Sequence, residues 1–441
     1  MKRILRELHR IFPIEYEAAQ ERDAEYMPNF LARSHRRQQA KLFKRLKQED
    51  MDDGVRRMAQ MELERLYLPF HLLPVQSVDG NFVQVWADDE DFADSATFIP
   101  GFGKVLSQAQ DNMREGVRRK IVLPKSLATK IVKNLERLAD RLQGKNPKKI
   151  KKDGLPALED MILFMRREYI PYSRDSLGYV HLGAVGVRMY DSLVRRYTNN
   201  EVQNAQEAIR RIGKQISSLR IALASHAPLP SATPLMTRQE VAHNIERILA
   251  RMRREGEFSN GIPPFKIKWV RRAKSADSPI AFYQPPPRNT MYLNPKLLKR
   301  LLPVDLKILM LHEIGGHHCM EQRVDQNKFG VRKIVKFIHG NSSDAERCGM
   351  RCEVVAERWG KECARAAHEW WLLRNVRGLV DARMHHSGWS PNRCKTLFKA
   401  MGVPSRIVDV DEEIVRYASW PGQALAYVFG RLPITECLCG E

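Results

Sequence analysis

The chain has 441 residues, in which 74 lysine and arginine residues outnumber 52 aspartate and glutamate residues, so the formal net charge is +22. This length is sufficient to bury a large core, either in two domains or in one elongated helical body with a cleft. The surplus of positive charge favours anionic partners, among them acidic substrates, nucleic acid and membrane surfaces, without choosing between them.

The seven cysteines all lie in the C-terminal third, and their odd number excludes a typical secreted disulfide scaffold. The first ten residues alternate charged and apolar side chains, so they lack the uninterrupted apolar segment of a signal peptide. No stretch approaches the roughly 20 apolar residues of a membrane-spanning helix. We therefore expect a cytoplasmic protein with reduced cysteines and no membrane span.

The N-terminal half is predicted to be mainly helical. Residues 1 to about 70 have the pattern of basic amphipathic helices, and further helices are expected from Pro124 to Gln143 and from 157 to 225. The segment from His71 to Gly103 is expected to be irregular, with a short strand at Phe82–Trp86. The basic runs lack interleaved aromatic residues and carry no RNA-binding signature, so nucleic acid is compatible with the charge but not favoured as a partner.

A proline-rich segment from Ser225 to Thr237 is the clearest boundary in the chain. We therefore predict an N-terminal, mainly helical region at residues 1–235 and a second region at residues 236–441. Thr237 and Glu240 have the spacing of a capping box, which predicts a helix that continues to about Arg254.

Three short strands are predicted after this helix. Phe265–Val270, Ile280–Tyr283 and Met291–Leu293 are separated by turns rich in glycine and proline. An edge of such a sheet could hold an extended peptide through backbone hydrogen bonds, although the sheet could equally be structural.

A helix is predicted to begin at Pro303 and to carry the sequence His312-Glu313-Ile314-Gly315-Gly316-His317-His318. Imidazoles beside a carboxylate suit a zinc hydrolase, although a packed histidine cluster is the alternative. On a regular α-helix, residue i+5 is rotated by roughly 140° from residue i, which is too far to share one ion.

A π-bulge would bring residue i+5 onto the face of residue i, and the two glycines stand where such a bulge would form. We therefore predict His312 and His317 as metal ligands. Glu313 is the predicted general base, and His318 is expected to support a ligand or to pack against other rings.

Glu346 and Glu353 supply the remaining predicted contacts of a zinc site. Glu346 is the candidate third ligand, but Ser343 and Glu346 also fit a capping box, and the spacing alone does not separate these alternatives. Glu353 is expected to orient a ligand histidine, with an exposed helical glutamate as the alternative.

These residues, taken in order along the chain, resemble a bacterial family of uncharacterised HExxPGHH proteins related to the zinc carboxypeptidases of the Taq type. The likeness extends from about Val117 to Ile434, with Gly315-Gly316 replacing the Pro-Gly of the family and shortening the motif by one residue. The resulting HExxxH spacing is similar to that of the tubulin tyrosine carboxypeptidases, which supports His317. Further matching residues are Arg374, Arg377, Asp381, His385, Gly388, Trp389, Arg416, Tyr417, Pro421–Tyr427 and Gly430.

The resemblance implies a mainly α fold, with an elongated gluzincin-like helical body, a central cleft and a small β-sheet beside the metal helix. It also shifts Glu346 toward the role of metal ligand. Tyr427 and His385, which lie in the matching motifs, are the candidate donors to an oxyanion, with Asp381 orienting His385. Buried packing is the alternative for Tyr427, and complementing the helix dipole is the alternative for His385.

The expected function is therefore a hydrolase of peptide or amide bonds that uses one zinc ion, with residues 236–441 as its catalytic region. A carboxypeptidase is one form of this hypothesis, in which Arg416 would bind a free chain end, unless it pairs with Glu412 or Glu413 on its own helix. The alternatives are a small-amide hydrolase of a biosynthetic pathway and a catalytically silent protein that binds an acidic partner.

Overall fold

In this computed structural model, residues 2–20, 26–74, 101–143, 154–229, 237–254, 258, 261–270, 280–284, 289–321, 329–340 and 342–429 are described. The fold is mainly helical with one small sheet, as predicted. The expected strand at Phe82–Trp86 and the midpoint of the predicted domain boundary lie outside the described residues.

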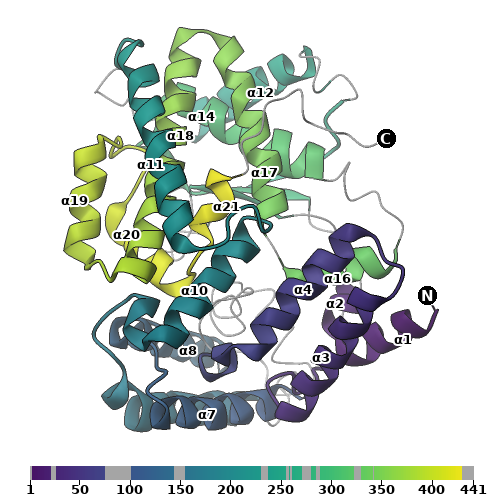
Figure 1. Cartoon of the computed structure of the whole chain (residues 1–441). Coiled ribbons are helices and arrows are strands. Elements are labelled where there is room, and N and C mark those ends of the chain that lie inside the picture. The colour runs from purple at the N-terminus through teal and green to yellow at the C-terminus, as the bar shows by residue number, and fades with distance from the viewer. Residues whose placement is uncertain are drawn as a thin grey trace.

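The N-terminal helices occupy one side of the molecule, drawn in purple in Figure 1. They are α1 (Lys2–Ile11), α2 (Pro13–Ala18), α3 (Arg33–Gln48), α4 (Asp53–Tyr67) and the 3-10 helix η1 (Pro69–Leu72). The apolar faces of α1 to α4 pack together and against α16 (Val331–His339), which belongs to the C-terminal half. The amphipathic helices predicted for this segment are confirmed, and they bury their apolar sides partly on a distant part of the chain.

The middle of the chain forms a second group of helices. They are α7 (Phe102–Arg118), α8 (Lys125–Gln143), α9 (Gly154–Phe164), the π-helical turn η3 (Met165–Tyr169), the 3-10 turns η4 (Ile170–Tyr172) and η5 (Tyr179–Leu182), α10 (Ala184–Tyr197) and α11 (Ala205–Ala224). In Figure 1, α11 runs beside α18, and the two helices pack closely. One large core contains residues from this group and from the C-terminal half.

The C-terminal half begins with a helix and a three-stranded sheet. Its first elements are α12 (Arg238–Arg254), β1 (Lys266–Trp269), β2 (Ala281–Gln284) and β3 (Thr290–Leu293). Thr237 and Glu240 form the predicted capping box at the start of α12, since the Thr237 N–H lies 2.6 Å from Glu240 and the Glu240 N–H lies 3.2 Å from the Thr237 hydroxyl.

The central strand β3 is parallel to β1 and antiparallel to β2. Ile267 pairs with Met291, and Tyr283 pairs with the same residue from the other side. Strand β2 contacts the helix that carries the histidines, which confirms the predicted position of the sheet.

The remaining elements include one long helix, α18, most of whose 27 residues are buried. These elements are α13 (Pro295–Leu298), α14 (Pro303–Met310), the π-helix η8 (Leu311–Glu321), α16, α17 (Ser342–Glu353), the 3-10 helix η9 (Val354–Trp359), α18 (Lys361–Ser387), α19 (Pro391–Met401), α20 (Val410–Ser419) and α21 (Ala424–Val428). Helix α18 packs against α14, η9, α19, α20 and α21 as well as α11. Among the described residues, no helix is both long and apolar enough to cross a membrane.

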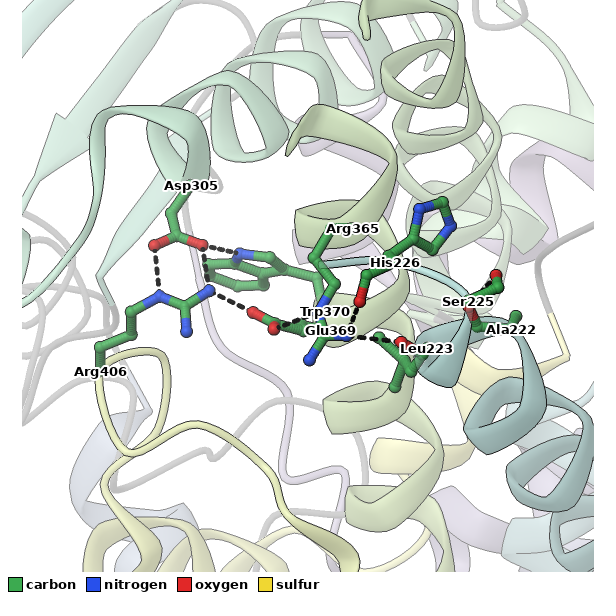
Figure 2. A network of polar contacts seen from close by, with 9 residues as sticks. All are labelled: Ala222, Leu223, Ser225, His226, Asp305, Arg365, Glu369, Trp370 and Arg406. Atoms are coloured by element: carbon green, nitrogen blue, oxygen red, sulfur yellow. Dashed lines mark hydrogen bonds and ion pairs between the residues drawn. The ribbon is translucent and has the colours of Figure 1, made fainter. Parts of the chain in front are cut away.

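A buried polar network fixes the start of α14, which continues directly into η8 (Figure 2). The Asp305 carboxylate accepts hydrogen bonds from the indole N–H of Trp370 at 2.9 Å and from Nε of Arg406 at 2.9 Å. Arg406 also pairs with Glu369, to which Arg365 donates at 2.7 Å. Because these side chains come from α14, α18 and the segment before α20, the network holds the histidine-bearing helix against the core.

Candidate metal centre

The histidines lie on an uninterrupted π-helix of 11 residues, η8. Its hydrogen bonds join residue i to residue i+5, so His317 returns to the side of the helix occupied by His312. The centroids of the two imidazole rings are 4.9 Å apart. The prediction of a single bulge therefore underestimated the distortion, but the face that it assigned to His317 is the one observed.

Glu346 of α17 completes a group with these two histidines, in which His312 and Glu346 are buried and His317 is partly exposed. One ligand atom from each of the three residues lies within 4.8 Å of the others. The Oε2 atom of Glu346 is 3.2 Å from Nε2 of His312 and 3.9 Å from Nε2 of His317. Ser343 lies inside α17, and its hydroxyl donates to Asn199. Glu346 thus faces the histidines, and the alternative of a capping box with Ser343 is wrong.

Glycines allow η8 and α17 to approach closely enough to form this group. A Cβ atom at Gly316 would lie 2.3 Å from Cα of Gly349, and one at Gly349 would lie 2.4 Å from Cε1 of His312. At Gly315, a Cβ would lie 2.9 Å from the Phe258 ring. Neither glycine of η8 has a positive φ. The glycine pair is therefore required by close packing between helices, rather than by an unusual backbone conformation.

Glu353 and Arg374 fix the orientation of His312 from its other side. Oε1 of Glu353 is 2.7 Å from Nδ1 of His312 and accepts a hydrogen bond of 2.9 Å from Nη2 of Arg374. All three side chains are buried. A carboxylate on one ring nitrogen fixes the tautomer and direction of a histidine, so Glu353 is placed to orient the His312 ring and is not an exposed helical glutamate.

Burial and the neighbouring groups have opposite effects on the pKa values of Glu346 and Glu353. Burial raises the pKa of Glu346, but the hydrogen bond with His312 and the nearby His317 outweigh it and lower the pKa to about 2. Burial likewise raises the pKa of Glu353, while the charge of Arg374 and the contact with His312 lower it to about 2. Both groups are therefore carboxylates at neutral pH.

The donor set suits a cation. His312 has a carboxylate oxygen at each of its ring nitrogens, whereas a neutral imidazole has only one N–H to share between them. A metal ion bound to Nε2 would satisfy Glu346, and the N–H at Nδ1 would then point to Glu353. Two imidazoles with one carboxylate form a known ligand set of catalytic zinc sites, so these residues fit zinc.

Glu313 and His318, which adjoin His312 and His317 in the sequence, have different surroundings. Glu313 is buried, and its carboxylate makes no hydrogen bond or ion pair with any residue that the structure describes. His318 turns away from the group, with Nδ1 at 2.7 Å from the Tyr283 hydroxyl and Nε2 at 2.8 Å from the Pro263 carbonyl oxygen. Its ring packs against Tyr283 and Phe265. His318 therefore has the ring-packing role expected for it.

Tyr427 of α21 lies beside the group. Its ring stacks on that of His312, with centroids 6.2 Å apart, and its hydroxyl hydrogen-bonds to Glu346. Nη2 of Arg416 lies 3.3 Å from the same hydroxyl. Arg416 also lies 3.7 Å from Glu413, so the contact with the site and the alternative ion pair on its own helix coexist.

Asp381 holds the turn that precedes α21. Both of its carboxylate oxygens lie 3.0 Å from the N–H of Gly422, and the Tyr190 hydroxyl donates to it at 2.6 Å. Burial raises the pKa of Asp381 to about 7 despite these donors. Asp381 thereby helps to place Tyr427, which is a different role from the predicted pairing with His385.

The predicted role of His385 as an oxyanion donor is wrong. His385 is fully buried, its Nε2 donates to the carbonyl oxygen of Tyr417 at 2.9 Å, and its ring lies between those of Tyr179 and Tyr190. Burial lowers its pKa to about 3, so it is neutral. A substrate could not reach this side chain without unpacking the core.

Two residues of the site were not assigned a role from the sequence. Arg374 supports Glu353, and Gly349 makes room for the His312 ring. The position of Gly349 near the site could have been predicted, because Glu346, Gly349 and Glu353 have the spacing of residues on one face of a helix. Arg374 is among the residues that match the family, but its role could not be read from the spacing, because its partner Glu353 comes from another helix.

Two solved structures resemble the whole chain. One is "the putative lipoprotein" from Colwellia psychrerythraea, with a TM-score of 0.66 and 14% identity over 97% of this chain and 88% of that chain. The other is "a putative lipoprotein of unknown function" from Shewanella oneidensis, with a TM-score of 0.55 and 12% identity over 97% and 90% of the two chains. At these identities, the likeness establishes the fold alone.

The descriptions of these two proteins as lipoproteins contradict the cytoplasmic location expected from the sequence. That expectation was based on the cysteines and on the first ten residues, and neither feature determines the cellular location of the protein. It is therefore withdrawn.

No curated protein matches the sequence. A family model described as "Bacterial protein of unknown function (DUF885)" matches residues 2–437, which is nearly the entire chain. The chain therefore belongs to the DUF885 family of bacterial proteins.

Proposed function

We propose that this protein is a zinc-dependent hydrolase of peptide or amide bonds. The observation that carries the proposal is the group of His312, His317 and Glu346, with ligand atoms within 4.8 Å of one another and with Glu353 on the outer nitrogen of His312. Three protein ligands leave a coordination position for water or substrate, as catalytic zinc sites require. Zinc, when bound, supplies a Lewis acid that activates water and polarises a carbonyl group.

Glu313 is proposed as the general base. It follows the ligand His312 directly, is buried beside it, and has no hydrogen bond or ion pair among the described residues that would occupy its carboxylate. Such a group is free to accept a proton from water and to return it to the leaving nitrogen.

Tyr427 is proposed to donate a hydrogen bond to the oxyanion that forms on the substrate. Its hydroxyl already lies at the ligand Glu346, and its ring is held against His312. A donor held in place before the reaction stabilises developing charge without reorganisation.

The test combines zinc analysis with digestion of a mixed peptide library by the purified protein. We expect one zinc per chain and hydrolysis that stops when zinc is removed and returns when zinc is restored. Glu313→Gln should keep zinc and lose about 10²–10⁴-fold in rate, because general-base catalysis contributes that much. Glu357→Gln is the matched control, since Glu357 lies 3.7 Å from His368 and outside the group.

A rate for Glu313→Gln close to that of the wild type would refute the mechanism. Hydrolysis that persists in the zinc-free protein would refute the proposed function. A library of small amides, digested in parallel, separates a peptide hydrolase from a hydrolase of small molecules.

A further inference from the structure

Three arginines surround the ring of Tyr427. The guanidinium carbons of Arg374, Arg377 and Arg416 lie 4.8, 5.1 and 6.0 Å from its centroid. Arg374 and Arg377 come from α18, and Arg416 comes from α20. Because like charges repel in a buried setting, such a group requires anions nearby.

The protein supplies fewer anions to this group than cations. Arg374 pairs with Glu353 at 2.9 Å, while Arg377 and Arg416 share Glu413 at 2.8 and 3.7 Å. Glu353 is also engaged by His312, and Glu413 accepts a hydrogen bond from the Tyr417 hydroxyl at 2.6 Å. The ion pairs of the three guanidinium groups therefore involve two carboxylates, so direct pairing leaves one positive charge unmatched.

Some of the arginine donors lack hydrogen-bond partners. Nη2 of Arg377 and Nε of Arg374 are buried, and neither has a partner among the residues that the structure describes. The Arg374 and Arg377 side chains are only 7% and 5% exposed, whereas that of Arg416 is 30% exposed. Buried donors are almost always satisfied in native proteins, so these two nitrogens require an acceptor that the described residues do not supply. Arg416 lies at the solvent-accessible side of the group.

The arginines are also close to the proposed zinc ligands. Nη2 of Arg416 is 3.3 Å from the Tyr427 hydroxyl, and that hydroxyl hydrogen-bonds to Glu346. A ligand bound to Arg416 is thus one hydroxyl group away from the metal cluster. The distance of 3.3 Å between Arg416 and the Tyr427 hydroxyl is similar to the length of one residue, since an extended chain advances about 3.3–3.6 Å per residue.

We propose that Arg374, Arg377 and Arg416 form a subsite for the terminal α-carboxylate of a peptide. One unmatched positive charge suits a monoanionic carboxylate better than a phosphate dianion, and guanidinium groups bind carboxylates through paired hydrogen bonds. Because the subsite adjoins the metal cluster, the bond that is hydrolysed is the last peptide bond of the chain. Water adds across that bond, its C–N bond breaks, and the products are a shortened peptide and a free amino acid.

This inference rests on the proposed hydrolase function, and the experiment separates the two. Peptides of one sequence set, N-terminally acetylated, are prepared with either a free or an amidated C-terminus and incubated with the zinc-loaded protein. Mass spectrometry then identifies each product. We expect release of the last residue from the free acids, and a rate at least about tenfold lower for the amides, since a charge-assisted pair of hydrogen bonds is lost.

Arg416→Gln should remove the preference by raising KM for the free acids at least about tenfold more than KM for the amides, because only the free acids lose a charge-assisted pair of hydrogen bonds. Arg416→Lys, which keeps the charge but not the paired donors, should restore part of it. Arg211→Gln is the matched control and should keep the full preference. Like Arg416, Arg211 is partly exposed, stacks on an aromatic ring, that of Phe429 at 5.0 Å, and pairs with a glutamate on its own helix.

Equal cleavage of free acids and amides, or an Arg416→Gln variant that keeps the preference, would refute the carboxylate subsite and leave the hydrolase intact. Absence of any zinc-dependent cleavage in either set would instead refute the proposed function, and the subsite with it.

Discussion

Two buried triads of the same composition occupy different parts of this molecule. In one, His312 Nδ1 lies 2.7 Å from Glu353, which also pairs with Arg374. In the other, His339 Nδ1 lies 2.7 Å from Glu62, which also pairs with Arg196. The second triad joins α4, α10 and α16, and so connects the N-terminal helices to the C-terminal half.

The difference lies at the opposite side of the imidazole. His312 faces a second imidazole and a second carboxylate there. Among the described residues, His312, His317 and Glu346 form the one group of three potential metal ligands, and His339 is not part of such a group. A buried histidine with a carboxylate and an arginine is therefore compatible with a purely structural role. The π-helix makes the first triad a candidate metal centre, because it adds His317 to the same face.

The largest expected effect is a difference in zinc affinity between variants of the individual histidines. His317→Ala should weaken zinc binding by more than the roughly 10–100-fold that loss of an outer partner costs, because a direct ligand is removed. His318→Ala should keep most of the affinity, since His318 faces Tyr283 and Pro263. His339→Ala should keep full zinc content but lower Tm. Competition with a zinc chelator measures the affinities, and a greater loss in His318→Ala than in His317→Ala would overturn the assignment.

Gly349→Ala tests the close approach of the two helices. The added methyl group would lie 2.4 Å from the His312 ring, so the ring or α17 must move and the three ligand atoms must separate. We expect zinc binding to fall strongly while the protein remains folded. Gly213→Ala, at a position in α11 with nothing within 4 Å, is the control and should have no effect on zinc. Unchanged zinc affinity in Gly349→Ala would contradict the geometry proposed for the centre.

Equivalent substitutions in the two triads should have opposite consequences. Glu353→Gln should reduce zinc affinity by roughly 10–100-fold, as expected for a partner that orients a ligand. Glu62→Gln should leave zinc affinity unchanged and lower the free energy of unfolding by about 3–5 kcal/mol, because it leaves Arg196 without its buried counter-charge. Chelator competition and denaturant titration measure the two effects. Loss of zinc in both variants would mean that the triads do not differ in function.

The smallest expected effect concerns pH. Burial raises the pKa of Glu62, but the charges of Arg196 and Arg65 and the contact with His339 lower it well below its ordinary value of 4.5. The folded state then binds fewer protons than the unfolded state in acid, so this stability is present above about pH 4.5 and is lost as the pH falls. Denaturant titrations of the zinc-free protein should show a steeper acid loss for the wild type than for Glu62→Gln. Identical slopes would contradict the lowered pKa.

The elements near the site could largely be predicted, because their signals are local. The helix start at Pro303, the three short strands and the face of His317 all follow from patterns within a few residues. The sequence does not separate the two roles of Glu346, because the contact of its carboxylate with His312 depends on where α17 crosses η8. His385 was misassigned because the rings of Tyr179 and Tyr190, which bury it, lie far away in the sequence.

X-ray absorption at the zinc edge of the purified protein tests the central claim most directly. We predict one zinc per chain with two imidazole nitrogens at about 2.0–2.1 Å and carboxylate oxygen at about 2.0–2.2 Å. In the His317→Ala variant, one imidazole should be missing from the spectrum. Absence of zinc from the protein, or a sulfur shell at about 2.3 Å that indicates cysteine ligands, would contradict the account.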